Sequence, residues 1–408
     1  MLTKFFPYGN GEAFIENEMK VLSEYYDQIV IFACEVPKNE IIKRDIPDNV
    51  EAYRISSISK KIDIINGLFH SKNFDKNYRM EKKYCNTFLK KCILDYFEEK
   101  SHRIYNEILK SRILDKFTSE PFLIYSYWFF MTARVGVLIS ENYKPAIMFS
   151  RAHGYDLYEE RNKVKYLPYR RLFLEKYDYV FPCSEHGTNH LKKLYPELSN
   201  NVKTSLLGTL DHGIGKASSD GKIRIVSCSR VEPVKRVEKI VDSLAELDTN
   251  NINIEWTHIG DGSGFDKLKM YAAEKLKFIP VNFKGNMNNK EVMKYYSTNP
   301  VDLFLNVSSS EGLPVSIMEA MSYGIPCIAT DVGGSSEIVI NNLTGRLIPG
   351  DFEKKELASI ITDFINNNNK RNEFRINCRN YWCQKFQAIS NYHKLHSEIN
   401  DYCKKNYK

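Results

Sequence analysis

The sequence of 408 residues lacks several features that would assign it to a special class of protein. Its nine cysteines are an odd number, spread from Cys34 to Cys403 without a CxxC pair. This spacing argues against a disulfide framework or a structural zinc site and favours a reducing compartment. The start has no basic segment leading into a long apolar run, and no apolar run is long enough to cross a bilayer. We therefore expect no signal peptide, no membrane span and a cytoplasmic protein.

The chain also has little net charge, +7 in total, but its basic residues are concentrated in residues 60–92. This stretch contains nine Lys/Arg against three Asp/Glu, which gives +6. Two interpretations remain open: a solvated helical face, or a patch that makes a peripheral contact with anionic lipid headgroups at the inner membrane face. Nucleic acid is not expected as a partner, because no recognised binding motif accompanies the charge.

What the sequence has is a repeated alternation of short apolar runs with longer helical patterns. Two domains are expected from a chain of this length. The alternation is typical of parallel sheets with crossover helices. The expected strands are 28–34, 122–128, 146–153 and 179–184 in the first half, and the stretches KIRIVSCS, INIEWTHIG, VNFKG, DLFLNVS and PCIATDVGG in the second.

The pattern is interrupted at residues 208–221, which carry four glycines and two serines and are expected to be a linker. We therefore predict two Rossmann-like domains, an N-terminal one over 1–207 and a C-terminal one over 222–385. A helix over 386–408 is expected to pack back on the N-terminal domain. Two facing Rossmann-like domains bind ligands beyond the carboxyl ends of their strands, which here means a cleft between them.

The stretch SSSEGLPVSIMEAMSYGIPCIATDVGG sets two glutamates, Glu311 and Glu319, around a helix start. Pro314 suits a first helical position, so we predict a helix over 314–323 with Leu313 at the cap position. Leucine offers no side-chain oxygen to the first amides, and an uncapped helix start favours an anion such as a phosphate. Each carboxylate is then expected to accept a hydrogen bond from a hydroxyl. Acidic residues also favour helix starts for structural reasons alone.

Cations that could bind such a phosphate follow the first strand of the second domain. Arg230 and Lys235 lie in the turn before a predicted helix. An arginine can bind phosphate oxygens in a bidentate manner, and a lysine adds a point charge. Either residue alone would be typical of an exposed loop, so the prediction depends on the two together with the helix start.

These elements together resemble the retaining glycosyltransferases of family 4. The resemblance lies in Arg-x4-Lys followed about 75 residues later by Ser-x-x-Glu-Gly-x-Pro-x4-Glu-Ala-x3-Gly-x-Pro, and it covers most of residues 222–385. In the first half, FPYGNGEAFIENEM resembles the family's glycine-rich loop and SRAHGYD, 150–156, its histidine loop. The resemblance implies an α/β protein of the GT-B architecture that takes a nucleotide-diphosphate sugar as donor.

The resemblance also implies a role for each matching residue. Arg230 and Lys235 would bind the diphosphate, Glu311 the transferred sugar and Glu319 the ribose. Donor contacts are further implied for Gly11, Gly285, Met287, Gly312, Leu313 and Val315. His153 would be a hydrogen-bond partner of the donor sugar or the acceptor. Arg236 departs from the family pattern, because glycine commonly follows the lysine there.

We therefore expect a retaining glycosyltransferase that moves a sugar, with UDP as the favoured nucleotide, to a glycan or lipid-linked acceptor in cell-envelope polysaccharide synthesis. No cofactor or metal is expected, because no Asp-x-Asp follows a strand. Two alternatives stay open: a GT-B nucleotide-sugar epimerase or hydrolase, and a non-catalytic partner subunit that keeps the fold for assembly.

Overall fold

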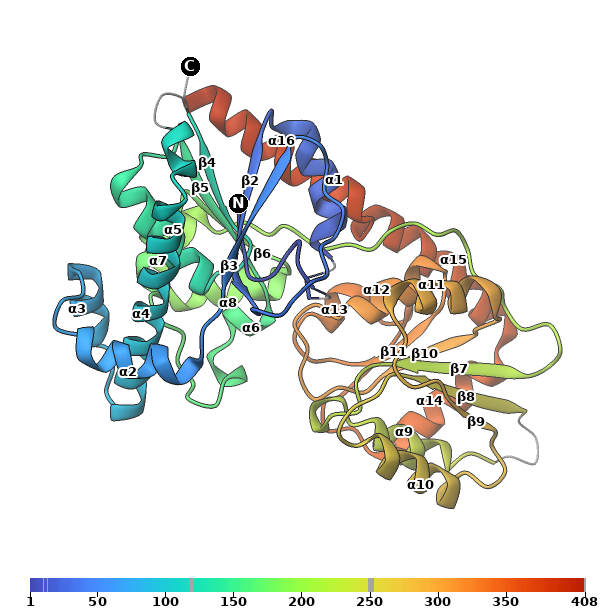
Figure 1. The fold of residues 1–408 in the computed structure, drawn as a ribbon. Coiled ribbons are helices and arrows are strands. Elements are labelled where there is room, and N and C mark those ends of the chain that lie inside the picture. Colours follow the sequence, from blue (N-terminus) through green and yellow to red (C-terminus); the bar gives the residue numbers. More distant parts are fainter. Residues whose placement is uncertain (10, 13, 118–120, 249–252, 407–408) are drawn as a thin grey trace. The chain divides into compact units, whose positions relative to one another are not determined.

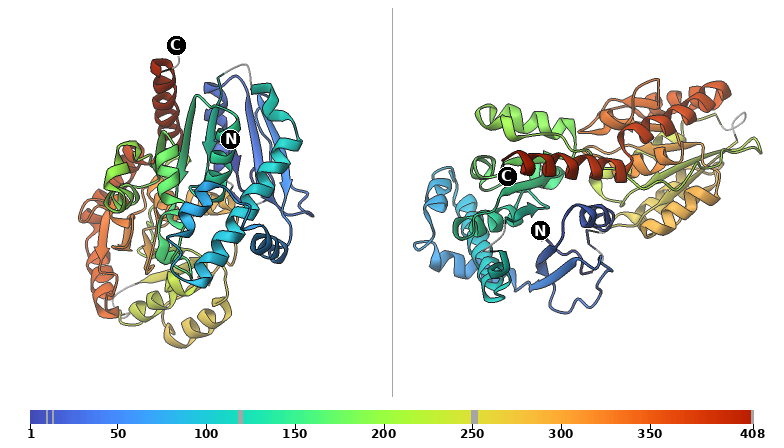
Figure 2. Two further views of the ribbon diagram at one scale, coloured as in Figure 1. Left: turned by 90° about the vertical axis from the view of Figure 1, so that its left-hand side faces the viewer. Right: turned by 90° about the horizontal axis from the view of Figure 1, so that it is seen from above.

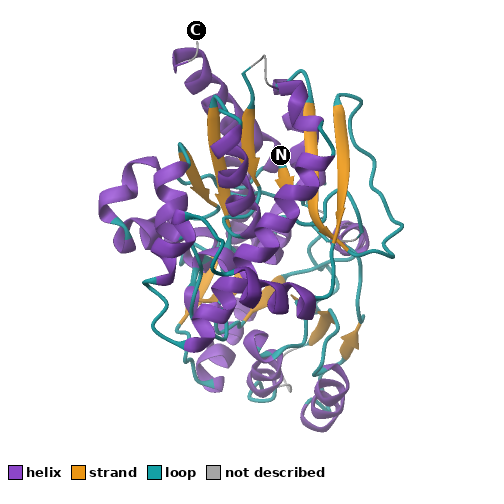
Figure 3. Cartoon of the chain, turned by 60° about the vertical axis from the view of Figure 1, so that its left-hand side comes forward, coloured by secondary structure: helices purple, strands orange, loops and turns teal. Residues whose placement is uncertain are grey.

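The computed structural model describes residues 1–9, 11–12, 14–117, 121–248 and 253–406, without the side chain of Asn406. The chain divides into two compact units. The first consists of Met1–Ser205 with Ile389–Lys408, and the second is Leu206–Ala388. Each unit is built around its own sheet with helices on both faces, which Figures 1, 2 and 3 show from different sides.

The first unit contains a six-stranded parallel sheet with the order β3-β2-β1-β4-β5-β6. Its strands are β1 Leu2–Thr3, β2 Ile29–Val36, β3 Val50–Ser56, β4 Leu123–Ser126, β5 Ile147–Ala152 and β6 Tyr179–Pro182. Alternate residues of a strand point to opposite faces of the sheet. In β2, Val30 and Phe32 accordingly belong to one apolar core, and Ile31 belongs to the other.

Helices cover both faces of this sheet. They are α1 Ile15–Tyr25, α2 Lys60–His70, α3 Lys76–Lys82, α4 Phe88–Lys110, α5 Met131–Asn142, α6 Gly154–Leu157, α7 Arg170–Lys176, α8 Glu185–Leu194 and α16 Ala388–Asn406. Short 3-10 turns lie at Ile113–Phe117, Glu159–Arg161 and Pro196–Asn201. Apolar residues of α4, α5 and α7 form the core on one face, and those of α1 and α16 form the core on the other (Figure 1).

The second unit contains a six-stranded parallel sheet with the order β12-β11-β10-β7-β8-β9. Its strands are β7 Ile223–Cys228, β8 Ile254–Ile259, β9 Val281–Phe283, β10 Leu303–Asn306, β11 Cys327–Thr330 and β12 Gly345–Ile348. Its helices are α9 Val237–Leu244, α10 Phe265–Lys275, α11 Asn289–Thr298, α12 Val315–Ser322, α13 Ser335–Ile338, α14 Lys354–Asn366 and α15 Asn368–Lys385, with a 3-10 turn at Pro233–Lys235. Helices α9, α10 and α14 lie on one side of the sheet, and α11 and α12 lie on the other (Figure 1).

The two sheets share one strand order. Numbered within its own unit, each reads 3-2-1-4-5-6, the order of the Rossmann fold. The direction of winding reverses between β1 and β4 in the first unit and between β7 and β10 in the second. Ligands of such folds bind at the carboxyl ends of the strands beside this reversal. The topology therefore marks one edge of each sheet as the place for a site.

The predicted α/β class with two Rossmann-like sheets is confirmed. The sequence prediction missed β1, β3 and β12, of which β1 has only two residues. Residues 208–221, expected as a linker, lie within the second unit. There the Gly215 amide donates to the carbonyl of Tyr323, and the Ser218 hydroxyl donates to Asp302. Within the described residues, no helix is both long and apolar enough to cross a membrane.

One buried ion pair and its neighbours join four elements of the first unit. The Arg151 guanidinium of β5 lies 3.4 Å from the Glu18 carboxylate of α1, and both side chains are fully buried. His396 of α16 and the hydroxyl of Tyr125 in β4 also contact this carboxylate. Arg151, His396 and Tyr125 together lower the pKa of Glu18 to about 2, against the opposing effect of burial. The pair therefore fixes α1 and α16 against β4 and β5.

Replacing Glu18 with glutamine should destabilise the first unit by about 3 kcal/mol, because Arg151 would remain buried without a countercharge. Hydrogen exchange in urea, resolved for peptides of β4 and β5, measures this loss. Glu16→Gln on the same helix is the control. Its ion pair with Arg44 is partly exposed, so it should cost less than about 1 kcal/mol. Equal losses in the two variants would contradict the assigned role of the buried pair.

Candidate functional site

In the second unit, the predicted site residues follow β7 and β10, the two strands beside the reversal. Residues 229–236 connect β7 to α9 and carry Arg230 and Lys235. Residues 307–314 connect β10 to α12 and carry Glu311. Because β7 and β10 are adjacent parallel strands, their carboxyl ends bring these two loops together.

The carboxylate of Glu311 is the meeting point of the two loops. Its Oε1 lies 2.6 Å from the Lys235 ammonium and accepts a hydrogen bond of 2.6 Å from the Ser308 hydroxyl. The side-chain amide of Asn306, the last residue of β10, donates to the same oxygen at 3.3 Å. Within the described residues, Oε2 has no donor and stays available to a ligand. Arg230 is exposed, on the loop before Lys235.

Arg236 explains how the chain departs from the expected glycine. Its backbone is left-handed, with φ of +49°, a conformation that glycine adopts most readily. The guanidinium donates to the carbonyls of Val307, Ser308 and Gly350 at 2.6–2.9 Å. Arg236 therefore replaces the freedom of a glycine with three charge-assisted hydrogen bonds, two of them to the loop that carries Glu311.

The predicted start of α12 needs a correction. The helix begins at Val315, and its N-cap is Pro314, not Leu313. The first helical position is one residue later than predicted because Pro314 has an extended ψ of 102°. The interpretation as an uncapped start is unaffected, since proline also lacks a side-chain oxygen. The amides of Val315 and Ser316 have no acceptor among the described residues.

A close backbone contact fixes the loop before this helix. The Gly334 amide donates to the Gly312 carbonyl at 2.7 Å. A Cβ at Gly333 would lie 1.9 Å from the Glu311 carbonyl oxygen, and Gly333 has φ of +57°. The glycine pair after β11 is therefore required for the position of Glu311 and Gly312. The sequence analysis did not assign it to the site, although two adjacent glycines after a strand were visible.

Glu319 lies on α12, apart from the Lys235 contact. Its Oε1 accepts a hydrogen bond of 2.5 Å from the side chain of Asn289, the first residue of α11. Burial raises the pKa of Glu319 to about 7, and the Asn289 hydrogen bond opposes this only in part. By its exposure Glu319 is half-buried on α12. Asn289 was missed because no local pattern connects residues 30 positions apart.

Two of the predicted donor contacts, Gly285 and Met287, follow β9. Gly285 has φ of +66°, and its carbonyl accepts a hydrogen bond of 2.8 Å from the Gly260 amide at the end of β8. Met287 is half-buried. A Cβ at Gly260 would lie 1.9 Å from the Ser229 carbonyl oxygen. These glycines therefore let the ends of β7, β8 and β9 approach one another, which places Gly285 on the same sheet edge as Arg230.

In the first unit, the loop after β1 is organised by Glu12, which the sequence analysis missed. The described part of this loop, which excludes Asn10 and Ala13, carries the predicted Gly11 as an exposed residue. The Glu12 carboxylate accepts hydrogen bonds from the amides of Lys4, Phe5 and Phe6 and from the Trp128 indole. Glu12 therefore ties the loop after β1 to the segment after β4.

His153 lies after β5, at the same edge of the first sheet. Its ring is buried against Tyr127 and Trp128, with centroid distances of 5.2 and 4.6 Å. Burial lowers the pKa of His153 to about 3, so the imidazole is neutral at physiological pH. Neither ring nitrogen has a hydrogen-bond partner in the described structure. A neutral imidazole with both nitrogens unpaired can donate one hydrogen bond and accept another.

One group of potential metal ligands lies outside these loops. Ligand atoms of Asp75, Glu98 and His102 lie within 4.8 Å of one another. The Arg134 guanidinium already contacts Asp75 and Glu98, each at 2.6 Å. Arg134 thus supplies the positive charge that a metal would bring, and we assign the group a structural role. The expectation that the reaction needs no metal stays a prediction.

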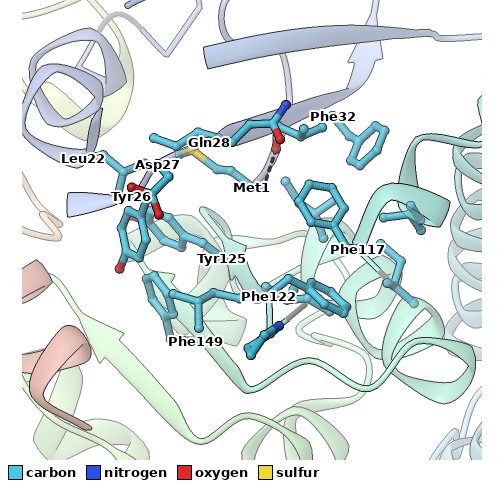
Figure 4. A pocket seen from close by; sticks show the side chains of 18 of the residues that line it. Met1, Leu22, Tyr26, Asp27, Gln28, Phe32, Phe117, Phe122, Tyr125 and Phe149 are labelled. Carbon is cyan, nitrogen blue, oxygen red and sulfur yellow. Dashed lines mark hydrogen bonds between the residues drawn. The ribbon is translucent and has the colours of Figure 1, made fainter. Parts of the chain in front are cut away.

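A small pocket of about 280 Å³ in the first unit lies at the opposite edge of the sheet (Figure 4). It is lined by residues at the amino ends of β1, β2 and β4, among them Met1, Gln28 and Leu123. It contains no predicted site residue. Its position at the amino ends of the strands argues against a role in the site.

Comparisons with known proteins show what the second unit is similar to. Residues 214–381 match the family model for glycosyl transferases group 1. The second unit carries a glycosyl transferases group 1 domain. This match confirms the predicted transferase class for that domain; assignment to family 4 and the retaining mechanism stay predictions.

Relatives and solved structures extend the similarity. Over 126 residues the chain is 33% identical to a lipopolysaccharide 1,6-galactosyltransferase of Escherichia coli, a match that covers 30% of this chain and 34% of that protein. The chain thus matches about a third of the length of this curated relative. Sucrose-phosphate synthase from Thermosynechococcus elongatus has a TM-score of 0.71 and 15% identity, covering 97% of this chain and 94% of that one. Anabaena HepE in complex with UDP and glucose has a TM-score of 0.64 and 16% identity, covering 98% of both. These two similarities show the fold, GT-B.

The role of Arg236 in the glycosyl transferases group 1 domain can be tested by two substitutions. Arg236→Ala and Arg236→Gly both remove the three hydrogen bonds to carbonyls and should each cost about 2 kcal/mol or more. Arg236→Ala should be less stable than Arg236→Gly by roughly 1 kcal/mol, because only glycine adopts φ of +49° without strain. Hydrogen exchange of β7 and β10 in urea measures both. An alanine variant as stable as the glycine variant would refute the backbone argument.

Proposed function

We propose that the chain is a retaining glycosyltransferase that moves a sugar from a UDP-sugar to a glycan or lipid-linked acceptor in cell-envelope polysaccharide synthesis. The observation that carries the proposal is the contact between Lys235 and Glu311 beside the uncapped start of α12. A cation, unpaired amides and a carboxylate with one unpaired oxygen are the groups that a sugar diphosphate requires.

The diphosphate is proposed to bind Lys235, Arg230 and the amides at the start of α12. In the structure the Lys235 ammonium donates a hydrogen bond to Glu311, and Arg230 is exposed. The backbone amides of Gly312, Leu313 and Val315 would add donors, because a helix start favours negative charge. Gly11, exposed on the loop after β1, would let that loop approach the phosphate.

The two carboxylates are proposed to bind hydroxyl groups. In the described residues, Oε2 of Glu311 and Oε2 of Glu319 have no hydrogen-bond donor. The first is proposed to bind the transferred sugar and the second the ribose. The base would lie against the backbone of Gly285 and Met287. Both glutamates are therefore proposed to bind hydroxyl groups, and neither is assigned as a general base.

The proposed reaction is a front-face substitution. The bond between the anomeric carbon and the donor phosphate oxygen breaks, and the bond to the acceptor oxygen forms on the same face. The acceptor's proton goes to the departing phosphate oxygen, so no protein base is needed. Lys235, Arg230 and the helix start stabilise the charge on the leaving diphosphate. His153, neutral and unpaired, is proposed to hold a hydroxyl of the donor sugar or the acceptor by a hydrogen bond.

Two comparisons support the choice of donor and acceptor class. HepE, whose fold the chain shares, binds UDP and glucose. The Escherichia coli relative of the second unit is a lipopolysaccharide galactosyltransferase, and another, 29% identical over 119 residues, is an O-antigen biosynthesis glycosyltransferase. Both of these relatives act on glycans of the cell envelope.

We further propose that the protein acts on the cytoplasmic face of a membrane and contacts it through residues 60–92. Large apolar side chains are exposed there between the basic residues. They are Ile62, Ile65, Leu68, Phe69, Met80, Tyr84, Phe88 and Leu89. Exposed apolar side chains flanked by lysines match the interface of an anionic bilayer.

A donor screen tests the function. Nucleotide release from a panel of UDP- and GDP-sugars is measured with lipid-linked and soluble acceptors. Release that requires an acceptor supports a transferase, whereas release or isomerisation without one would favour the hydrolase or epimerase. Calorimetry with UDP and GDP completes the test, because absence of nucleotide binding would favour the non-catalytic subunit.

Lys235→Ala should lose orders of magnitude in turnover, because the leaving diphosphate loses a cation that contacts the site. Lys239→Ala is a matched control. The Lys239 ammonium contacts the carbonyl of Phe352 at 3.4 Å and the ring of the same residue, so this variant should keep normal turnover. Initial rates at saturating donor measure both variants. Near-normal transfer by Lys235→Ala would overturn the assignment.

The affinity for UDP should rise with pH through about 7, because the ribose hydroxyls donate to Glu319 only when this carboxyl, whose pKa burial raises to about 7, is ionised. Below that pH the affinity should fall by at most about tenfold per pH unit. Glu319→Gln should bind UDP more weakly at pH 8 and lose this slope, leaving only the titration of the UDP phosphate. Calorimetry from pH 5.5 to pH 8.5 gives both profiles; parallel profiles would contradict the role of Glu319.

A further inference from the structure

The first unit contains a pocket of about 940 Å³. It extends from the loop after β1 to α2 and α4. Its walls come from that loop, α2, α4, the segment 128–132 and residues 155–166. Of the proposed donor-binding residues, only Gly11 lines this pocket, so the donor does not account for it.

Most of the pocket wall is apolar. Its apolar lining includes Ile64 of α2, Leu89, Ile93 and Phe97 of α4, and Phe130 and Val164. Leu89 is 56% exposed, so the apolar wall continues to the surface of the unit. Burial of a hydrocarbon chain against such an apolar lining makes its binding favourable.

The pocket also carries uncompensated positive charge. Of its four lysines, Lys100 is paired with Glu35 at 2.7 Å. The other lining carboxylate, Glu12, is held by three backbone amides and the Trp128 indole. Lys4, Lys60 and Lys163 form no ion pair within the described residues. An apolar wall with three unpaired ammonium groups is complementary to a hydrocarbon that carries an anion.

One end of the pocket reaches the predicted reaction site of this unit. Trp128 lines the pocket, and its ring lies 4.6 Å from the ring of His153. Gly11 and Glu12 line the same end. A chain bound between α2 and α4 would therefore present its polar head at the carboxyl edge of the first sheet.

We propose that this pocket binds the lipid part of the acceptor, a hydrocarbon chain attached to a phosphate, with the chain between α2 and α4 and the phosphate among Lys4, Lys60 and Lys163. The identification of this ligand as the acceptor rests on the proposed transferase function. The binding itself does not, and it can be measured without a sugar donor.

Dodecyl phosphate below its micelle concentration is the probe, and the fluorescence of Trp128 is the readout. Trp256 and Trp382 are fully buried in the other unit, so a change reports on the pocket. We expect saturable binding by the full chain. Dodecyl maltoside, which lacks the phosphate, and inorganic phosphate, which lacks the chain, should both bind at least about tenfold more weakly.

Matched variants localise the binding. Leu89→Asp should lower the affinity for dodecyl phosphate at least about tenfold. Leu194→Asp, at a leucine of α8 that is 53% exposed, should bind dodecyl phosphate normally. Lys60→Gln should lower the affinity for dodecyl phosphate but not that for dodecyl maltoside. Lys61→Gln, at an exposed neighbour outside the pocket lining, should change neither affinity.

Three results would overturn the proposal: no saturable binding, equal binding by Leu89→Asp and the parent chain, or binding only to phosphatidylglycerol vesicles. The last would assign the apolar side chains to a bilayer surface and not to a pocket. UDP calorimetry on the same variants keeps the two proposals apart. If the parent chain does not bind UDP but binds dodecyl phosphate, the proposed transferase function is contradicted and the proposed lipid phosphate pocket is not.

Discussion

The reversal of winding in a parallel sheet is the constraint on which the candidate site depends. In each unit, neighbouring strands beside the reversal feed loops that leave the same edge in opposite directions. In the second unit, this places Lys235, after β7, 2.6 Å from Glu311, after β10, although 76 positions separate them. No local interaction could bring these residues together, because each loop is positioned by its own strand.

Hydrogen bonds to backbone carbonyls then hold the loops in shape. Arg236 ties the end of β7 to the segment 307–308 and to Gly350, and Gly333 allows the loop after β11 to contact the backbone of Glu311. Both residues support the position of Glu311 without contacting the proposed ligand. The loop is therefore fixed before a donor arrives, which lowers the cost of organising charged groups around it.

In each unit, burial favours the neutral form of one titratable site residue. In the second unit, it raises the pKa of Glu319 towards neutrality, and Lys235 stays at the surface of the site. In the first unit, it lowers the pKa of His153 and leaves a neutral imidazole beside Trp128. The first unit thus offers hydrogen bonds and an apolar pocket with unpaired lysines, and the second offers Lys235 beside an uncapped helix start. That division suits the proposed acceptor on one unit and the proposed diphosphate on the other.

The sequence by itself determined the α/β class, most of the strands and the residues grouped around α12, because strand periodicity and helix-start chemistry are local. It did not determine the role of Arg236, the hydrogen bond from Asn289 to Glu319, the loop organised by Glu12, or the two-residue strand β1. It also placed the cap of α12 one residue too early. Only the tertiary structure decided these features, because each depends on atoms brought together across a sheet or between helices, where burial and geometry, not neighbouring residues, set the interaction.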